Sequence, residues 1–162
     1  HDPLTGLANR HALHQQFTAL KNSGPLCVAF IDLDNFKHVN DTLGHRSGDE
    51  VLMRLSQRFR EACPPGIIPG RLGGDEFVLL MPYGLNHPLV KRVAQACLDA
   101  ATIPFELDNG NAHIGASIGI DEVSGESDFS EALLLADRAM YAIKHHGKNG
   151  VMLGTEDIRL QA

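Results

Sequence analysis

The feature that most constrains the fold is a continuous apolar run, residues 26–31, that ends at Asp32. Such a run is typical of a strand buried on both faces, in the middle of a sheet that helices cover. A carboxylate directly after a buried strand is costly to bury, and it is well placed to bind a cation at the edge of the sheet. For a lone aspartate the ordinary alternative is the capping of a loop. The run therefore predicts a layered fold and one candidate position for chemistry.

Composition limits the class of protein. The 162 residues are enough for one domain with a hydrophobic core, and the net charge of −6 argues against a general binder of nucleic-acid backbones. No apolar run approaches the roughly 18 residues of a membrane span. Because the sequence starts without Met or a signal-peptide pattern, we expect residues 1–162 to be a single domain excised from a larger regulatory protein. Any membrane anchor of that parent protein would lie outside these residues.

Three cysteines, Cys27, Cys63 and Cys97, show no C-x-x-C spacing. They predict free thiols, with Cys27 and Cys97 buried, and hence a reducing, cytoplasmic setting.

Periodicity and turn residues predict the remaining elements. Helices are expected over residues 9–21, 88–101 and 129–145, and a capping box at residues 47–50 predicts the start of another. Apolar segments at 67–72 and 77–81 flank one hairpin turn, segments at 105–107 and 112–120 flank a second, and residues 151–153 suggest a short last strand. This order predicts an α+β, ferredoxin-like fold whose central, mainly antiparallel sheet is flanked by helices.

A second acidic cluster, Asp75 and Glu76, follows the Gly73–Gly74 pair at the tip of the first predicted hairpin. If that hairpin lies beside the strand that ends at Asp32, all these carboxylates converge at one end of the sheet. Ligands that are oxygen only suit Mg²⁺ or Mn²⁺ better than zinc. The two glycines permit positive φ angles and let a bulky ligand approach the backbone, although a Gly-Gly pair alone is more often a mere turn.

Further polar residues follow Asp32 along the chain. Lys37 offers a cation for phosphate, while Asn40 and Asp49 offer an amide and a carboxylate. A carboxylate can accept hydrogen bonds from N1–H and the 2-amino group of guanine, a donor pair that adenine lacks. Each residue alone has an ordinary structural explanation: solvated surface, turn former or partner of a helix dipole. Together they predict a purine-nucleotide site.

The segment RLGGDEF at residues 71–77 resembles the signature of the GGDEF-domain diguanylate cyclases. Further motifs appear in the same order: DPLTGLANR at 2–10, FIDLDNFK at 30–37, ND at 40–41, GHxxGD at 44–49 and ADxAMYxxKxxGxN at 136–149. The resemblance implies a nucleotidyl-cyclase palm that condenses two GTP into cyclic di-GMP and two pyrophosphates. It also implies a homodimer for catalysis, because each domain holds one GTP. The isolated chain is expected to be monomeric, with an upstream regulatory domain controlling dimerisation.

The resemblance also implies roles by position. Two Mg²⁺ (or Mn²⁺) per active site are expected at Asp32, the Leu33 carbonyl, Asp75 and Glu76. Asp75 and Glu76 are the expected catalytic residues, and Asp75 assists loss of the ribose 3′-OH proton. The other expected positions are Asn40 and Asp49 for guanine, Asn35, Phe36, Lys37, Lys144 and Lys148 for the β- and γ-phosphates, Gly73 and Gly74 for ribose and α-phosphate, and a structural pair, Asp2 and Arg71.

Two positions depart from the family pattern. Lys148 stands where the family usually has Arg, which keeps the charge but loses the planar fork. The inhibitory R-x-x-D site for the product corresponds here to Pro64 and Ile67, so neither charge is present. Two alternatives to an active cyclase stay open. One is a catalytically silent module that binds GTP or a protein partner, and the other is a palm with a different nucleotide specificity.

Overall fold

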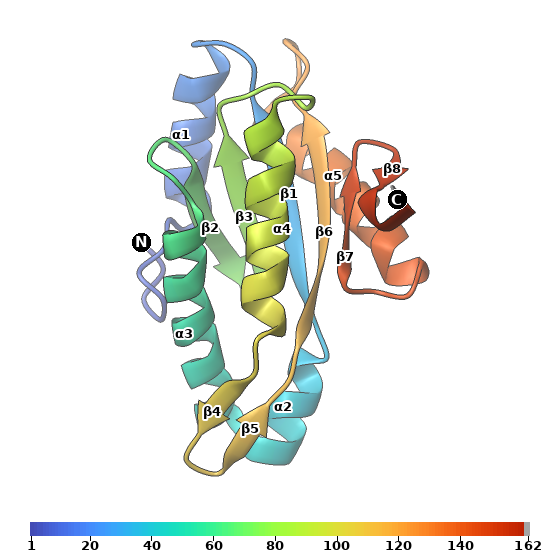
Figure 1. Ribbon diagram of the computed structural model, residues 1–162. Helices are drawn as coiled ribbons and strands as arrows, with labels where there is room; N and C mark the ends of the chain where they lie inside the picture. The colour runs from blue at the N-terminus through green and yellow to red at the C-terminus, as the bar shows by residue number, and fades with distance from the viewer. Residues whose placement is uncertain (161–162) are drawn as a thin grey trace.

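The computed structural model describes residues 1–160, which form one six-stranded sheet with helices on both faces (Figure 1). The sheet order is β2-β3-β1-β6-β7-β8, from β1 (Cys27–Asp34), β2 (Ile68–Gly73), β3 (Glu76–Met81), β6 (Gly115–Glu122), β7 (Gly150–Leu153) and β8 (Glu156–Asp157). The helices are α1 (Arg10–Lys21), α2 (Phe36–Leu43), α3 (His45–Ala62), α4 (Pro88–Thr102), α5 (Phe129–His145) and the short 3₁₀ helix η1 (Ile158–Leu160). A separate hairpin consists of β4 (Phe105–Leu107) and β5 (Gly110–Ala112).

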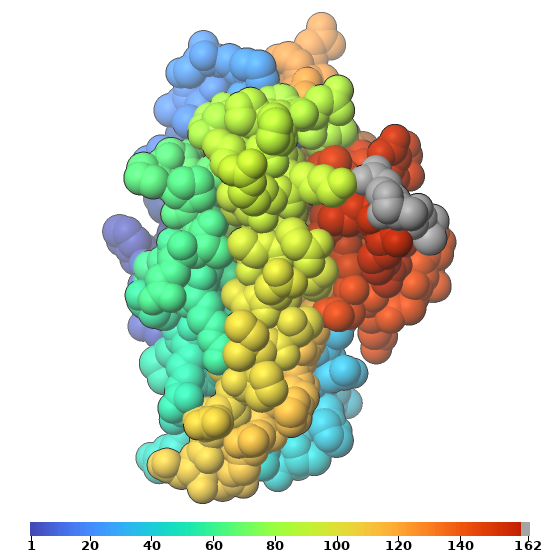
Figure 2. All heavy atoms as spheres, viewed as in Figure 1, coloured from blue at the N-terminus to red at the C-terminus, as the bar shows by residue number. Residues whose placement is uncertain are grey.

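Strand β1 is central, as its apolar run predicts, and pairs antiparallel with both β3 and β6. Its side chains alternate between two cores. Ile31 and its cross-strand partner Phe77 pack under α2, α3 and α4, whereas Phe30 and its partner Val78 pack under α1 and α5. Figure 2 shows α3 and α4 side by side over the first of these faces. Among the named strands of residues 1–160, β6–β7 is the only parallel pair, so the α+β fold with a mainly antiparallel sheet is confirmed.

Two strand predictions need correction. Strand β1 continues to Asp34, so Asp32 lies within the sheet rather than after it. The predicted strand at 112–120 is two strands, β5 and β6, and residues 115–120 are buried on both faces. The alternation of apolar residues from Ala112 to Ile120 predicts only one buried face. The other face is covered because α5 packs closely on it: a Cβ at Gly119 would lie 2.0 Å from the Met140 backbone nitrogen.

Two helix predictions are also wrong. Helix α3 begins at His45 rather than at a capping box, because Gly44, with φ +93°, ends α2 and precedes α3 directly. The Ser47 hydroxyl instead donates to the Asn109 side chain at 2.9 Å. The predicted bounds of α5 are confirmed, but the helical spacing of Leu135, Met140 and Ile143, which predicts one shared buried side, is wrong for Leu135, since that side chain is 39% exposed.

All three cysteines are free thiols, with Cys27 and Cys97 buried as predicted. Within residues 1–160, none of the helices combines the length and the apolar character that a bilayer span requires.

Candidate active site

The acidic residues predicted to converge lie on the neighbouring strands β1 and β3. Asp32 is the direct cross-strand partner of Glu76, so both side chains lie on the face covered by α1 and α5. Asp75 precedes Glu76 at the hairpin tip, and its backbone carbonyl accepts a hydrogen bond from the Leu33 N–H at 3.2 Å. The tip can turn here because Gly73 and Gly74 have φ angles of +147° and +51°.

Burial, followed by repulsion between neighbouring carboxylates, controls the pKa values of Asp32 and Glu76 in this acidic cluster. Burial, reinforced by the charges of Asp75 and Glu76, raises the pKa of Asp32 to about 6, against the opposing effect of Lys144. Burial and the Asp75 charge likewise raise the pKa of Glu76. The carboxylate oxygens of Asp32, Asp75 and Glu76 form a donor set suited to a hard divalent cation, whose charge would favour the ionised form of Asp32 and Glu76. Within residues 1–160, however, no group of three or more His, Cys, Asp or Glu side chains is already arranged to hold a metal, so the metal ligands stay a prediction.

Lys144 of α5 reaches the same end of β1. Its Nζ lies 2.6 Å from an Asp34 carboxylate oxygen, 3.8 Å from Asp32 and 3.5 Å from the Leu33 carbonyl oxygen. Asp34, only 2% exposed, also accepts from the Ser117 hydroxyl and the Asn149 N–H, each at 2.8 Å. Asp34 is not among the predicted site residues. Its position two residues after Asp32, on the same face of the strand, was the available indication.

The other predicted phosphate residues come from two loops that meet. Asn35 at the β1–α2 junction has φ +67°, and Lys148 and Asn149 after α5 have φ angles of +63° and +49°. These loops border a cavity of about 300 Å³, lined by Asp34, Asn35, His113, Ile114, Gly115, Gly147, Lys148 and Asn149. Phe36 anchors the start of α2 in the core, while Lys37 and Lys148 are exposed. The structure therefore brings Asn35, Lys144 and Lys148 to one end of the sheet.

The two predicted guanine residues lie on adjacent helices, Asn40 on α2 and Asp49 near the start of α3. Asn40 packs tightly over Gly48, where an added Cβ would lie 1.8 Å from the Asn40 amide oxygen. Asp49 is exposed. Helix α2 lies beyond the end of β1, and α3 starts near it before it runs along the face of the sheet (Figure 1). Their role towards guanine stays a prediction.

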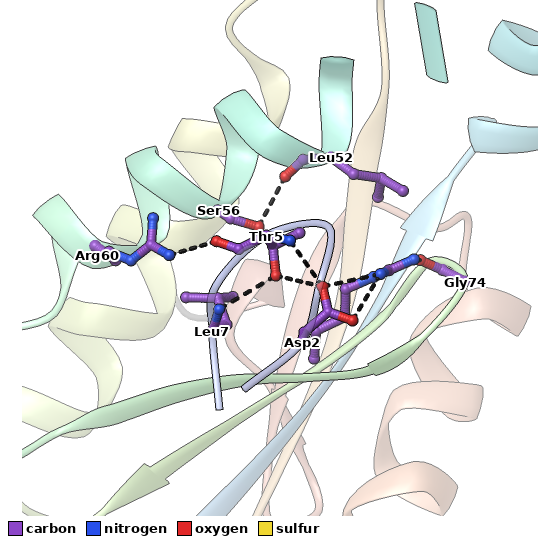
Figure 3. A network of polar contacts seen from close by, with 8 residues as sticks. Asp2, Thr5, Leu7, Leu52, Ser56, Arg60 and Gly74 are labelled. Carbon is purple, nitrogen blue, oxygen red and sulfur yellow. Dashed lines mark hydrogen bonds and ion pairs between the residues drawn. The ribbon is translucent and has the colours of Figure 1, made fainter. Parts of the chain in front are cut away.

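The N-terminal turn is fastened to the acidic hairpin (Figure 3). The Arg71 guanidinium lies 3.0 Å from both Asp2 oxygens, which is the expected ion pair, and it also donates to the Gly74 carbonyl at 2.9 Å. Thr5 donates to Asp2 through both its N–H and its hydroxyl. Burial alone would raise the pKa of Asp2, but these hydrogen bonds outweigh it and lower that pKa. The contact with Gly74, absent from the sequence prediction, fixes the residue directly before Asp75.

The positions of the degenerate inhibitory site lie in the turn between α3 and β2. The Ile67 N–H donates to the Pro64 carbonyl at 3.2 Å, and the Ile67 side chain, 5% exposed, belongs to the core. Neither side chain presents a charge at the surface.

Comparison with known proteins identifies the family. The family model described as diguanylate cyclase, GGDEF domain, matches residues 1–150. Diguanylate cyclase DgcP of Escherichia coli is 40% identical over 157 residues, covering 90% of this chain and 44% of that protein. An uncharacterised protein of Mycobacterium bovis is 38% identical to this chain over 165 residues, which is 26% of that protein's length. The chain therefore spans only part of the curated proteins that it resembles.

Solved structures agree with this assignment. The GGDEF domain of TpbB (YfiN) from Pseudomonas aeruginosa matches with a TM-score of 0.84 at 32% identity, over 99% of this chain and 98% of that one. The GGDEF domain of DgcB from Caulobacter crescentus, solved in complex with c-di-GMP, also matches with a TM-score of 0.84, at 27% identity, over 96% and 95% of the two chains. With its assembled acidic hairpin and a family match over residues 1–150, the chain belongs to the GGDEF domain family of diguanylate cyclases.

Proposed function

We propose that this domain is an active diguanylate cyclase that joins two GTP molecules into cyclic di-GMP and releases two pyrophosphates. The observation that carries the proposal is that Asp32 on β1 lies next to Glu76 on β3 and to Asp75 in the turn before it, with the Lys144 Nζ 3.8 Å from Asp32. A silent module would be expected to have lost part of this set.

The proposed roles follow from chemistry and position. Asp32, the Leu33 carbonyl, Asp75 and Glu76 would hold two Mg²⁺ or Mn²⁺ ions. When bound, such ions stabilise charge on attacking and leaving oxygens. Lys144 and Lys148 bind the β- and γ-phosphates together with Lys37 and the loop at Asn35 and Phe36. The Asp75 carboxylate receives the proton of the ribose 3′-OH. Gly73 and Gly74 leave room for the ribose and the α-phosphate, since a Cβ at either would meet nothing within 4 Å.

The direct test is incubation with GTP and Mg²⁺, followed by chromatography for cyclic di-GMP and pyrophosphate. The proposal expects both products in a 1:2 ratio, because two GTP molecules close one ring. Tight GTP binding without product would instead identify a silent module. Equal turnover of ATP would indicate a palm of other specificity.

Guanine recognition gives a second test. Asp49→Ala and Asn40→Ala are each expected to weaken GTP binding roughly tenfold or more, because each removes a hydrogen-bonding partner of the base. Inosine triphosphate, which lacks the 2-amino group, is a matched control ligand. Asp49→Ala should reduce the difference in affinity between GTP and inosine triphosphate. Calorimetry gives the affinities and thermal melting the stability. A GTP affinity within threefold of wild type, with a steeply lowered melting temperature, would show that the residues are structural.

Assembly gives a third test. One domain holds one GTP, so we propose that two chains must face each other, under the control of an upstream regulatory domain on the cytoplasmic side. The isolated chain should be mainly monomeric, and its net charge of −6 adds mild repulsion between copies. The rate per chain should therefore rise with enzyme concentration, and fusion of a dimeric coiled coil before His1 should raise it further. If the rate per chain stays constant from nanomolar enzyme concentration upward, and sedimentation shows a monomer, a reaction between two domains is contradicted.

A further inference from the structure

The last residues that the structure describes contact the loop that carries Lys148. The family match ends at residue 150, whereas β8 and η1 follow it and turn back beside β7 (Figure 1). Arg159 of η1 donates from Nη1 to the Lys148 carbonyl at 2.6 Å and from Nη2 to the His146 carbonyl at 3.0 Å. Its side chain thus holds two backbone carbonyls of the segment that ends α5.

Arg159 is itself held in place by Asp157. The guanidinium makes a two-pronged pair with this carboxylate, at 2.6 Å from Nη2 and 3.0 Å from Nε, and Asp157 is only 8% exposed. Gly150 is required for this approach, because a Cβ there would lie 2.7 Å from the Arg159 Nε. A two-pronged pair with a buried carboxylate fixes the plane of the partly exposed guanidinium, so its remaining donors point in defined directions.

The loop that Arg159 holds has an unfavourable backbone. Gly147, Lys148 and Asn149 have φ angles of +99°, +63° and +49°, and the second and third are not glycines. Such conformations persist only where the surroundings fix them. On the cavity side the fixing contacts come from Asp34, which accepts the Asn149 N–H, and from the Ala116 N–H, which donates to the Asn149 side chain. Arg159 does not line the cavity that Lys148 and Asn35 share.

We infer that Arg159, oriented by Asp157, is a positioning residue that fixes the residue 146–149 loop so that Lys148 binds the outer phosphates of GTP. The inference rests on the proposed function. Phosphate binding by this loop depends strongly on the position of its backbone, because Lys148 stands where the family usually has arginine. The lysine ammonium is a single charge on a flexible side chain and cannot bind phosphate in two places as a planar guanidinium can. Its position therefore depends on the backbone of residue 148, which Arg159 holds through the carbonyl oxygen.

Calorimetry with GTP, GDP and GMP tests this on the full chain and its Arg159→Ala variant. We expect GTP binding to weaken roughly tenfold, because a displaced Lys148 loses its charge-assisted contact with the outer phosphates. The affinity for GDP should fall less than the affinity for GTP. The affinity for GMP should fall less than twofold, because GMP lacks the outer phosphates. In turnover assays KM for GTP should rise more than kcat falls. Arg159→Lys should rescue only in part, because one ammonium cannot hold both carbonyls and Asp157.

Arg92→Ala is the matched control, since it removes an exposed arginine from α4 without touching the loop. It should leave all three affinities unchanged. Arg159→Ala that lowers the melting temperature but keeps GTP affinity would overturn the inference, and so would an equal loss for GTP and GMP. A wild-type chain that binds GTP more tightly than GMP but makes no cyclic di-GMP would overturn the proposed function alone. A wild-type chain that binds no GTP would overturn both.

Discussion

Asp75→Asn is expected to reduce formation of cyclic di-GMP by a hundredfold or more, because loss of such electrostatic stabilisation typically has this effect. Asp75 lies at the hairpin tip, with its backbone bonded to Leu33 and its carboxylate close enough to Asp32 to raise that group's pKa. The substitution keeps the size of the side chain and removes only its charge. Product would be measured by chromatography at saturating GTP and Mg²⁺.

Stability should change in the opposite direction. Asp75 raises the pKa of Asp32, so at neutral pH the folded state contains two carboxylates that repel each other. Removing one of them relieves that repulsion, and Asp75→Asn should melt at the same or a higher temperature at pH 7 without added metal. The difference from wild type should shrink as the pH falls below about 6, where Asp32 takes up a proton.

Asp99→Asn is the matched control, because it removes an exposed carboxylate on α4. It should keep full activity. More than about a tenth of wild-type activity in Asp75→Asn would show that the carboxylate is dispensable and would contradict the proposed role. A large drop in melting temperature would instead identify Asp75 as a structural residue of the hairpin.

The parts of the fold that the sequence predicts are those that local patterns encode. The apolar run before Asp32 specifies a central strand because only a strand covered on both faces can bury every residue in it. The bounds of α5 follow from its periodicity and its Asp128 cap. At Ser47 a local capping pattern is overridden, because α3 already begins at His45 and the Ser47 hydroxyl donates to Asn109, which is distant in sequence.

The site residues that the sequence predicts are those whose side chains are chemically distinctive at their positions in the sequence. Asp32, Asp75 and Glu76 are recognisable because a carboxylate directly after a long apolar run is costly to bury, and because a second acidic pair follows at the Gly73–Gly74 turn. No comparable sequence pattern singles out Arg159. It acts through the carbonyl oxygens of His146 and Lys148, which every residue possesses, so only the folded chain shows the contact. Asp34 is intermediate, since its position beside Asp32 suggests the site but its partners are fixed by tertiary structure.

Product feedback is expected to be absent. The relative DgcB has been solved with c-di-GMP bound, and the family's inhibitory site is R-x-x-D, whose two charges are replaced here by Pro64 and Ile67. A charge-assisted contact with Arg contributes about 1.5–3 kcal/mol, so its loss alone weakens binding about tenfold or more, and loss of the Asp contact extends this towards a thousandfold. The structure strengthens the expectation, because Ile67 is 5% exposed and packs in the core.

Calorimetric titration with cyclic di-GMP, beside an activity assay with added product, measures this directly. We expect no saturable binding at micromolar product and no inhibition. Pro64→Arg restores one of the two charges at a half-buried turn position, without disturbing the buried Ile67 side chain. Tighter binding by this variant would show that the missing charge is the cause. A dissociation constant near or below about 1 µM for the wild-type chain, with matching inhibition, would contradict the expectation, since the loss of two charged contacts excludes such affinity at the R-x-x-D position. It would place a product site on other residues of this domain.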